Sequence, residues 1–354
     1  MIIKRSHVRS VRVTRGGFTL AELLVSMAVL IIITLMLTQL MTNATAITRT
    51  AHKHIDTDTQ ARAVFDRMAL DFAQMIKRTD VDYYVKERAA YNGHGNGHGW
   101  GRGKNGDKGS DQIAFFSAVP GYYPQTSSQS PISLVAYRVT ESNSTDPAYG
   151  RLVRMAKGLL WNALDNNPNS NSPYPIVFLP QTIALVGKPW APAINNDNTC
   201  SGNNNSCDAD YEIIGPGVFR LEYYYLLKNG YLTDWPWDRR DDTSRFNISD
   251  PPSIGLSQVE SIGVAIAVID PAGRALLNAV SPDQIVNLAG DFPDFKSAHG
   301  QGNQSKTIGD LEDRWKTIVE STAQTGLSPS GLVVPPEAAK TIRIYSRYFD
   351  LKTL

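Results

Sequence analysis

Apolar residues dominate one long run near the start of the chain. Residues 18–41 form a 24-residue stretch with a single ionisable side chain, Glu22. At about 1.5 Å rise per residue, this stretch makes a helix of about 36 Å, longer than the roughly 30 Å hydrocarbon core of a bilayer. A charge inside such a span costs roughly 2.5–3.5 kcal/mol near the bilayer centre and less near its edge. The pattern therefore predicts a transmembrane helix over 18–41 in which Glu22 has a specific role.

The run after the span keeps a helical pattern. No glycine or proline occurs between residues 18 and 92, and within 64–76 apolar residues recur at three- and four-residue spacing. This spacing is typical of an amphipathic helix. We predict an amphipathic extension over 42–90 whose apolar stripe packs on a globular head; the alternative is that the stripe binds a separate partner helix. The more polar part, 42–60, is expected to be exposed or to unwind locally in a filament.

From residue 91 the sequence changes to short β-rich runs separated by Gly, Asn, Ser and Pro. Alternating or fully apolar runs bounded by turn residues are typical of strands. A helix on one side and a mostly antiparallel sheet on the other give an α+β head over 91–354. The predicted strands are 112–119, 133–140, 151–157, 218–227, 259–269 and 342–349.

Local patterns add further detail to the head. Residues 263–269 are apolar on both faces, which predicts a central strand, and a turn is expected at 270–273. Residues 141–150 have the character of a hairpin connection. Within the segment 281–340 a short helix is predicted from apolar residues at helical spacing, namely Leu311, Trp315, Ile318 and Val319.

A basic leader precedes the apolar run. Residues 1–17 carry five positive charges and no acid, which by the positive-inside rule keeps this end in the cytoplasm. An ordinary secretory signal has an apolar region of about 7–15 residues followed by a small-residue cleavage site. Here the apolar run is longer, and the small residues Gly16 and Gly17 lie ahead of it. The head is therefore expected on the far side of the membrane.

The junction GFTLAEL at 17–23 resembles the class III leader junction of type IV pilins and type II secretion pseudopilins. The resemblance implies a pilin-like fold and a membrane prepilin peptidase that cleaves after Gly17 and methylates the new amino terminus at Phe18. It also implies that Glu22 neutralises the buried ammonium of a neighbouring subunit and sets the register of assembly. The alternative is a plain signal anchor with a stray glutamate.

Patterns in the head resemble the minor pseudopilin J of type II secretion. They are AVFDRMALDFAQ at 63–74, VAYRV at 135–139 with GRLVR at 150–154, GVFRLEYYY at 217–225 with DWPW at 234–237, and VESIGVAI at 259–266. The resemblance implies a single-pass inner-membrane subunit at or near the tip of a pseudopilus, with a periplasmic head or one carried on an extracellular filament. Its implied partners are the prepilin peptidase and other pilin or pseudopilin subunits. The alternative is a minor type IV pilin acting in pilus assembly, adhesion or DNA uptake.

Composition and motifs argue against other classes of protein. Of the 35 Lys and Arg, five lie in the leader, so 30 remain against 34 Asp and Glu, and this balance does not suggest nucleic-acid binding. The head lacks the Gly-x-Ser-x-Gly, His-Glu-x-x-His and phosphate-loop motifs, so we expect no enzyme. A rival from another class is an adhesin or ligand-binding head with an aromatic surface at 223–225 and 235–237. Sheet core and turn packing are the preferred interpretation of those aromatic residues.

Two further candidate sites lie in polar loops. Cys200 and Cys207 are close in sequence and are expected to form a disulfide in an oxidising compartment. The adjoining carboxylates of Asp208, Asp210 and Glu212 offer oxygen ligands for Ca²⁺, but their spacing is not that of an EF-hand, and an exposed acidic turn is preferred. In the glycine-rich loop at 93–103, metal binding by the two histidines is less favoured than a solvated loop; they are His94 and His98. No cofactor is therefore expected.

Overall fold

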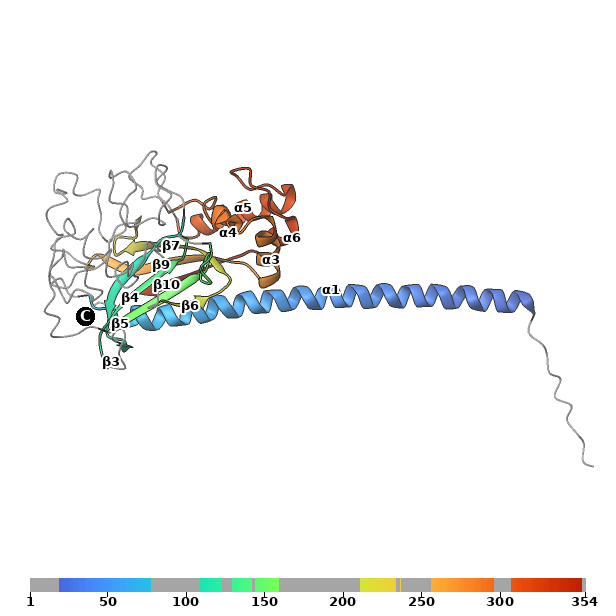
Figure 1. Ribbon diagram of the computed structural model, residues 1–354, viewed down its shortest axis with the longest axis horizontal. Coiled ribbons are helices and arrows are strands. Elements are labelled where there is room, and N and C mark those ends of the chain that lie inside the picture. Colours follow the sequence, from blue (N-terminus) through green and yellow to red (C-terminus); the bar gives the residue numbers. More distant parts are fainter. Residues whose placement is uncertain are drawn as a thin grey trace, which may run out of the picture. The chain divides into compact units, whose positions relative to one another are not determined.

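The computed structural model describes residues 19–77, 109–122, 129–141, 144–158, 211–233, 236, 256–295 and 307–351, with the side chains of 46–54 excepted. Tertiary contacts divide the chain into two compact units. We call Met1–His52 the amino-terminal unit and Lys53–Leu354 the head. Figure 1 labels the long first helix and most of the elements of the head.

Helix α1 (Leu20–Ala73) has 54 residues and belongs to both units. It is continuous through 42–60, so this part is helical in the single chain. The helix ends earlier than the predicted 42–90 extension, because the backbone after Ala73 pairs with a strand. Ile76 N donates to Phe116 O at 2.8 Å, and Ala118 N donates to Gln74 O at 2.9 Å.

The first sheet has the strand order β1-β4-β5-β2-β3, with β6 paired to β5. Its pairs are antiparallel except for the parallel pair of β2 and β5. The hairpin predicted across 141–150 is confirmed, because β4 and β5 pair in antiparallel register with Val139 opposite Leu152. The strands are β1 (Ile113–Ser117), β2 (Gly121–Tyr122), β3 (Gln129–Ser130), β4 (Ser133–Val139), β5 (Leu152–Gly158) and β6 (Tyr211–Gly215).

The second sheet is antiparallel and has the order β10-β9-β7-β8. Strand β9 lies between two long neighbours and is buried on both faces, which confirms the predicted central strand. Together the two sheets contain all six predicted strands; among the described residues, sequence patterns missed four others, β2, β3, β6 and β8. The strands of this sheet are β7 (Val218–Leu227), β8 (Leu232–Thr233), β9 (Val259–Val268) and β10 (Arg343–Asp350).

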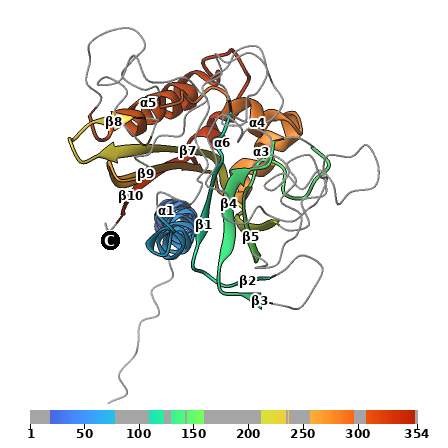
Figure 2. The ribbon, with the colours of Figure 1, turned by 90° about the vertical axis from the view of Figure 1, so that its left-hand side faces the viewer.

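Four helices cover one face of the second sheet, while α1 packs on the other face (Figure 2). They are α3 (Pro271–Val280), α4 (Gln284–Ala289), α5 (Asp310–Thr325) and α6 (Pro336–Ala339). The helix predicted from Leu311 and Trp315 is confirmed as α5. The turn predicted at 270–273 is wrong, because Asp270 caps α3 by accepting a hydrogen bond from Gly273 N and Pro271 occupies the first turn. The mixed α+β class is confirmed.

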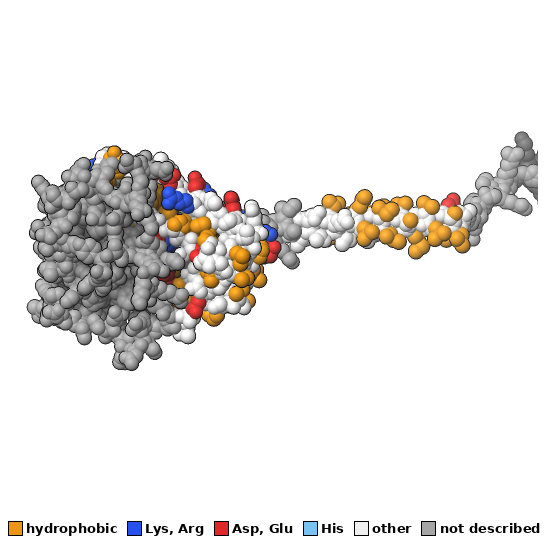
Figure 3. All heavy atoms as spheres, turned by 90° about the horizontal axis from the view of Figure 1, so that it is seen from above, with side chains coloured by type: hydrophobic (Ala, Val, Ile, Leu, Met, Phe, Trp, Pro, Cys, Tyr) orange, Lys and Arg blue, Asp and Glu red, His pale blue; other side chains and the backbone are white. Residues whose placement is uncertain are grey.

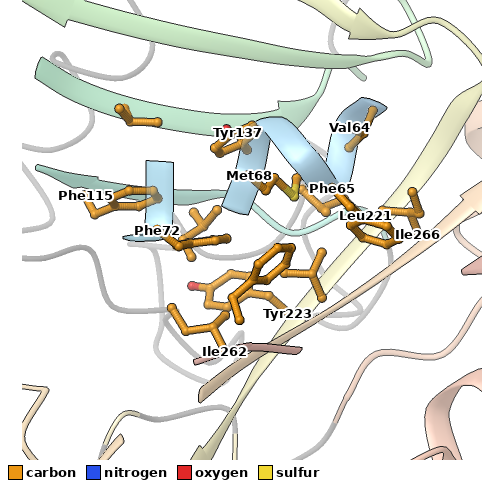
Figure 4. Packing of buried hydrophobic residues seen from close by; sticks show 14 of the residues in the cluster. Val64, Phe65, Met68, Phe72, Phe115, Tyr137, Leu221, Tyr223, Ile262 and Ile266 are labelled. Carbon is orange, nitrogen blue, oxygen red and sulfur yellow. The ribbon is translucent and has the colours of Figure 1, made fainter. Parts of the chain in front are cut away.

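The apolar stripe of α1 fills the space between the two sheets (Figure 4). Val64 and Met68 are 0% exposed, and Phe72 is 1% exposed. The ring of Phe72 stacks on Phe115 of the first sheet at a centroid distance of 4.9 Å and lies 5.0 Å from Phe349 of the second. The stripe is therefore covered by the two sheets of its own chain and not by a separate partner helix.

Candidate functional site

The candidate site is the amino-terminal turn of α1, where Thr19 and Glu22 form a reciprocal cap. Thr19 N and Thr19 Oγ1 donate to Glu22 Oε2 at 2.9 and 3.0 Å, and Glu22 N donates to Thr19 Oγ1 at 3.3 Å. This is a capping box, in which side chains at the first turn satisfy amides that have no partner within the helix. A carboxylate in this turn also lies at the positive end of the helix dipole.

The cap uses only part of the Glu22 carboxylate. Both bonds from Thr19 fall on Oε2, and Oε1 accepts no hydrogen bond from the residues that the structure describes. The side chain is exposed within the chain. An ionised carboxylate accepts about four hydrogen bonds, so Oε1 has the capacity to bind an ammonium group while Oε2 keeps the cap.

The stretch that follows, Leu20–Thr45, is the one described helical segment that is long and apolar enough to cross a membrane. None of it is buried inside the chain, and its apolar side chains cover the surface of this part of the helix (Figure 3). Its polar hydroxyls are satisfied locally: Thr34 and Thr38 donate to the carbonyls four residues earlier, each at 2.8 Å. Such back-bonding leaves no unsatisfied hydroxyl donor to be desolvated by lipid.

A buried ion cluster joins α1 to the first sheet inside the head. Arg154 Nε and Nη2 donate to the two oxygens of Asp71 at 2.7 and 3.0 Å, and the Tyr137 hydroxyl also donates to Asp71. Burial lowers the pKa of Arg154, but hydrogen bonding and attraction to Asp71 outweigh it and leave that pKa above its usual value. Burial and the Asp71 charge raise the pKa of Tyr137. These three side chains are at most 3% exposed, so the cluster fixes the helix on the sheet and offers no open site.

A second buried cluster joins β7 to the layer of helices. Arg220 Nη2 lies 3.2 Å from Glu222 Oε2 and also contacts Asp294, while Phe295 N donates to Glu222 Oε1 at 2.9 Å. The guanidinium lies 5.6 Å from the ring centre of Trp315. Sequence reasoning missed this cluster. The available signal was an opposite charge pair, Arg220 and Glu222, two residues apart and therefore on one face of an otherwise apolar strand.

Few of the other predicted site residues fall in the described part of the chain. Glu212 lies on β6, is exposed, and its Oε1 accepts a long hydrogen bond of 3.4 Å from Arg154 Nη1. The residues at 223–225 are at most 2% exposed, so their preferred place in the sheet core is confirmed and the alternative, an aromatic binding surface at these positions, is wrong. Within the described ranges no group of three or more His, Cys, Asp or Glu is arranged to hold a metal. The remaining predicted site residues lie outside the described part of the chain: Gly17, Phe18, His94, His98, Cys200, Cys207, Asp208, Asp210, Trp235 and Trp237.

Comparison with known proteins identifies no family for this chain. None of the protein-family models matches the chain, and no curated protein matches its sequence. In the first turn of α1, a carboxylate with one oxygen engaged in the cap stands at the start of a stretch that is long and apolar enough to cross a membrane.

Proposed function

We propose that the protein is a non-catalytic, membrane-anchored structural subunit of a pilin-like filament, processed between Gly17 and Phe18. The observation that carries the proposal is the position of the Glu22 carboxylate in the first turn of an apolar span. Its Oε2 accepts the hydrogen bonds of the helix cap, and its Oε1 accepts none from the described residues. A cap alone requires only a neutral acceptor at this position. A charged side chain is costly in a span, so its retention favours a charged partner.

Processing would create that partner. Cleavage after Gly17 places a new amino group at Phe18, and an α-amino group with an ordinary pKa near 8 is largely protonated at neutral pH. An ammonium entering an apolar filament core needs a counter-charge, and Glu22 Oε1 of a neighbouring subunit supplies one. The pairing fixes how far each helix is displaced along its neighbour, which sets the register of assembly.

The finer assignment is to a minor pseudopilin similar to J, at or near the tip of a type II secretion pseudopilus. In this assignment the span lies in the inner membrane, the head is periplasmic, and the partners are the prepilin peptidase and other pseudopilins. The support is a head in which two sheets and a layer of helices are built around the end of α1. Burial of 223–225 removes one of the two aromatic groups that favoured an adhesive head.

Processing is tested by Gly17→Val, with Gly16→Val as a matched control one residue away. The peptidase must seat a residue without a side chain at the cut, so Gly17→Val keeps its leader while Gly16→Val is cleaved. Mass spectrometry of the membrane fraction measures the amino terminus of each variant. Normal maturation of Gly17→Val contradicts the proposed processing site.

The role of Glu22 is tested by separating its charge from its cap. Gln at the third helical position also completes a capping box, so Glu22→Gln keeps the helix start and removes only the charge. We expect this variant to be cleaved and inserted normally but to co-purify with partner subunits severalfold less than wild type. Glu22→Ala removes both cap and charge and serves as the lower bound. Unchanged co-purification of Glu22→Gln would mean that the carboxylate acts only as a helix cap.

A further inference from the structure

Arg274, in the first turn of α3, is a buried cation with no acidic partner among the residues that the structure describes. It is 8% exposed, and its bonds go to backbone carbonyls: Nη1 donates to Tyr149 O at 3.5 Å and Nη2 to Gly150 O at 2.5 Å. Its Nε is buried and has no hydrogen-bond partner within the described part of the chain. A guanidinium has five N–H donors, so the two bonds to carbonyls leave capacity for further acceptors.

A second arginine follows the residue whose carbonyl Arg274 binds. Arg151 follows Gly150 directly, is partly exposed, and forms no ion pair with any residue that the structure describes. Burial and then the positive charge of Arg151 lower the pKa of Arg274 to about 10. The acids nearest in sequence to α3 have other partners: Asp270 accepts from Gly273 N, and Asp283 Oδ1 accepts from the Tyr149 hydroxyl at 2.8 Å.

Two other buried arginines of the head, Arg154 and Arg220, provide a contrast. Arg154 has the bidentate carboxylate of Asp71, and Arg220 contacts both Glu222 and Asp294. A buried charge without a counter-charge costs several kcal/mol, so proteins pair such groups or bring an ion to them. Arg274 is the one of these three arginines that lacks a carboxylate within the described residues.

We propose that Arg151 and Arg274 form a binding site for an oxyanion, either a phosphate or a carboxylate group. The planar guanidinium fork matches the geometry of both groups. The site also lies at the amino-terminal turn of α3, a helix of 10 residues whose dipole favours negative charge there. The oxyanion comes either from a free anion in solution or from a side-chain carboxylate of a neighbouring subunit.

The test uses full-length protein in a neutral detergent at constant pH and ionic strength. Melting temperatures are measured in chloride, in inorganic phosphate and in acetate, the last standing for a side-chain carboxylate. A ligand at about ten times its Kd raises the melting temperature of a protein of this size by about 3–5 °C. Phosphate also stabilises proteins by exclusion from their surface, so the quantity compared is the shift in each variant relative to wild type.

Arg151→Gln is the decisive variant, because Arg151 is partly exposed and its loss leaves the fold intact. Arg314→Gln, on the exposed face of α5, is the matched control. Wild type and Arg314→Gln should gain about 3 °C in phosphate or acetate, and Arg151→Gln and Arg274→Gln should lose that gain. A gain in phosphate alone identifies a free phosphate-type ligand, and a gain in acetate identifies a carboxylate. Equal gains in wild type and Arg151→Gln, or no gain in either anion, overturn the proposal.

Discussion

The two halves of α1 present apolar side chains to different surroundings. In the amino-terminal unit, Leu30 is 65% exposed and Leu35 is 58% exposed within the chain. In the head, Val64 is 0% exposed and Phe72 is 1% exposed. Both halves are regular helix, so secondary structure does not account for the difference. What differs is whether the chain itself supplies the covering surface.

The difference shows which half of α1 has its apolar side chains covered by its own chain. Burying apolar surface stabilises by roughly 25 cal/mol per Å², and in the head this gain is realised within one chain. Between Leu20 and Thr45 the described residues supply no such cover, so the same gain requires a surface from outside the chain, as the proposed insertion and assembly would provide. The carboxy-terminal half of α1 therefore governs folding of the head, while the amino-terminal half is left for the proposed insertion and assembly. Substitutions in the two halves should separate accordingly.

The largest expected effect is from Phe72→Ala. The ring is fully buried between Phe115 and Phe349, so its loss leaves a cavity where both sheets meet the helix. We expect the free energy of unfolding to fall by about 4 kcal/mol. Urea unfolding of the full chain in detergent, followed by tryptophan fluorescence, to which buried Trp315 contributes, measures it.

Two leucine variants provide matched controls for this cavity. Leu70→Ala changes a 56% exposed side chain on the same helix of the head, and Leu30→Ala changes one in the apolar half. Each should alter the unfolding of the head by less than about 0.5 kcal/mol. A large loss from Leu30→Ala would break the comparison, because it would make head stability depend on the apolar half.

Next in size is Asp71→Asn. The change keeps the shape of the side chain but leaves Arg154, 3% exposed, without its bidentate carboxylate. Removal of one partner of a buried pair costs about 3 kcal/mol, measured by the same urea unfolding. The paired variant Asp71→Leu with Arg154→Met, which removes both charges, should recover part of the loss. No recovery in the paired variant would argue against an uncompensated charge as the cause.

Sequence patterns predicted the elements whose signal is local. Strand β9 was predicted from an apolar run on both faces, and α5 from the helical spacing of Leu311 and Trp315. The start of α3 was mistaken for a turn, because Asp-Pro begins both a turn and a capped helix. The end of α1 was missed for a different reason. No residue near Ala73 breaks a helix, and the pairing of Met75 with Ser117 is long-range.

Residues of the sites also differ in whether a local sequence pattern reveals them. Glu22 stands out in the sequence because a single charge lies in an apolar run. Its capping partner Thr19 was not identified, although a threonine three residues before a glutamate is a recognisable capping signal. The surroundings of Arg274 had no sequence signal, because its hydrogen-bond acceptors are the carbonyls of Tyr149 and Gly150, more than a hundred residues earlier.

A smaller effect is expected from the contact between β10 and α1. Burial and a hydrogen bond to Asp58 raise the pKa of Tyr345 to about 12 from its usual value near 10. Below pH 10 the phenol is neutral in both states, so its contribution to stability is complete. Between pH 10 and 12 only the unfolded chain releases this proton, so the contribution is lost as pH rises.

We therefore expect the stability advantage of wild type over Tyr345→Phe to shrink between pH 9 and pH 12. Since the phenol is only half-buried, screening reduces the change to about 1 kcal/mol. Urea unfolding at both pH values measures the difference, and Tyr231→Phe, at a 41% exposed tyrosine, is the control. An advantage that is constant with pH would mean that the Tyr345 hydroxyl does not titrate in this range.

The smallest effect is expected from the exposed ion pair between Arg347 of β10 and Asp66 of α1. Arg347 Nη1 lies 2.7 Å from Asp66 Oδ1, but the two side chains are 43% and 72% exposed. Pairs of this kind contribute about 0.5 kcal/mol and weaken in high salt. A double-mutant cycle with Asp66→Ala and Arg347→Ala isolates the pair, because the contact of Arg347 with the Phe349 ring cancels in the cycle. A coupling energy above about 1.5 kcal/mol, unchanged in 1 M salt, would show that exposed charges hold α1 on the head as firmly as the buried contacts of Asp71 and Phe72.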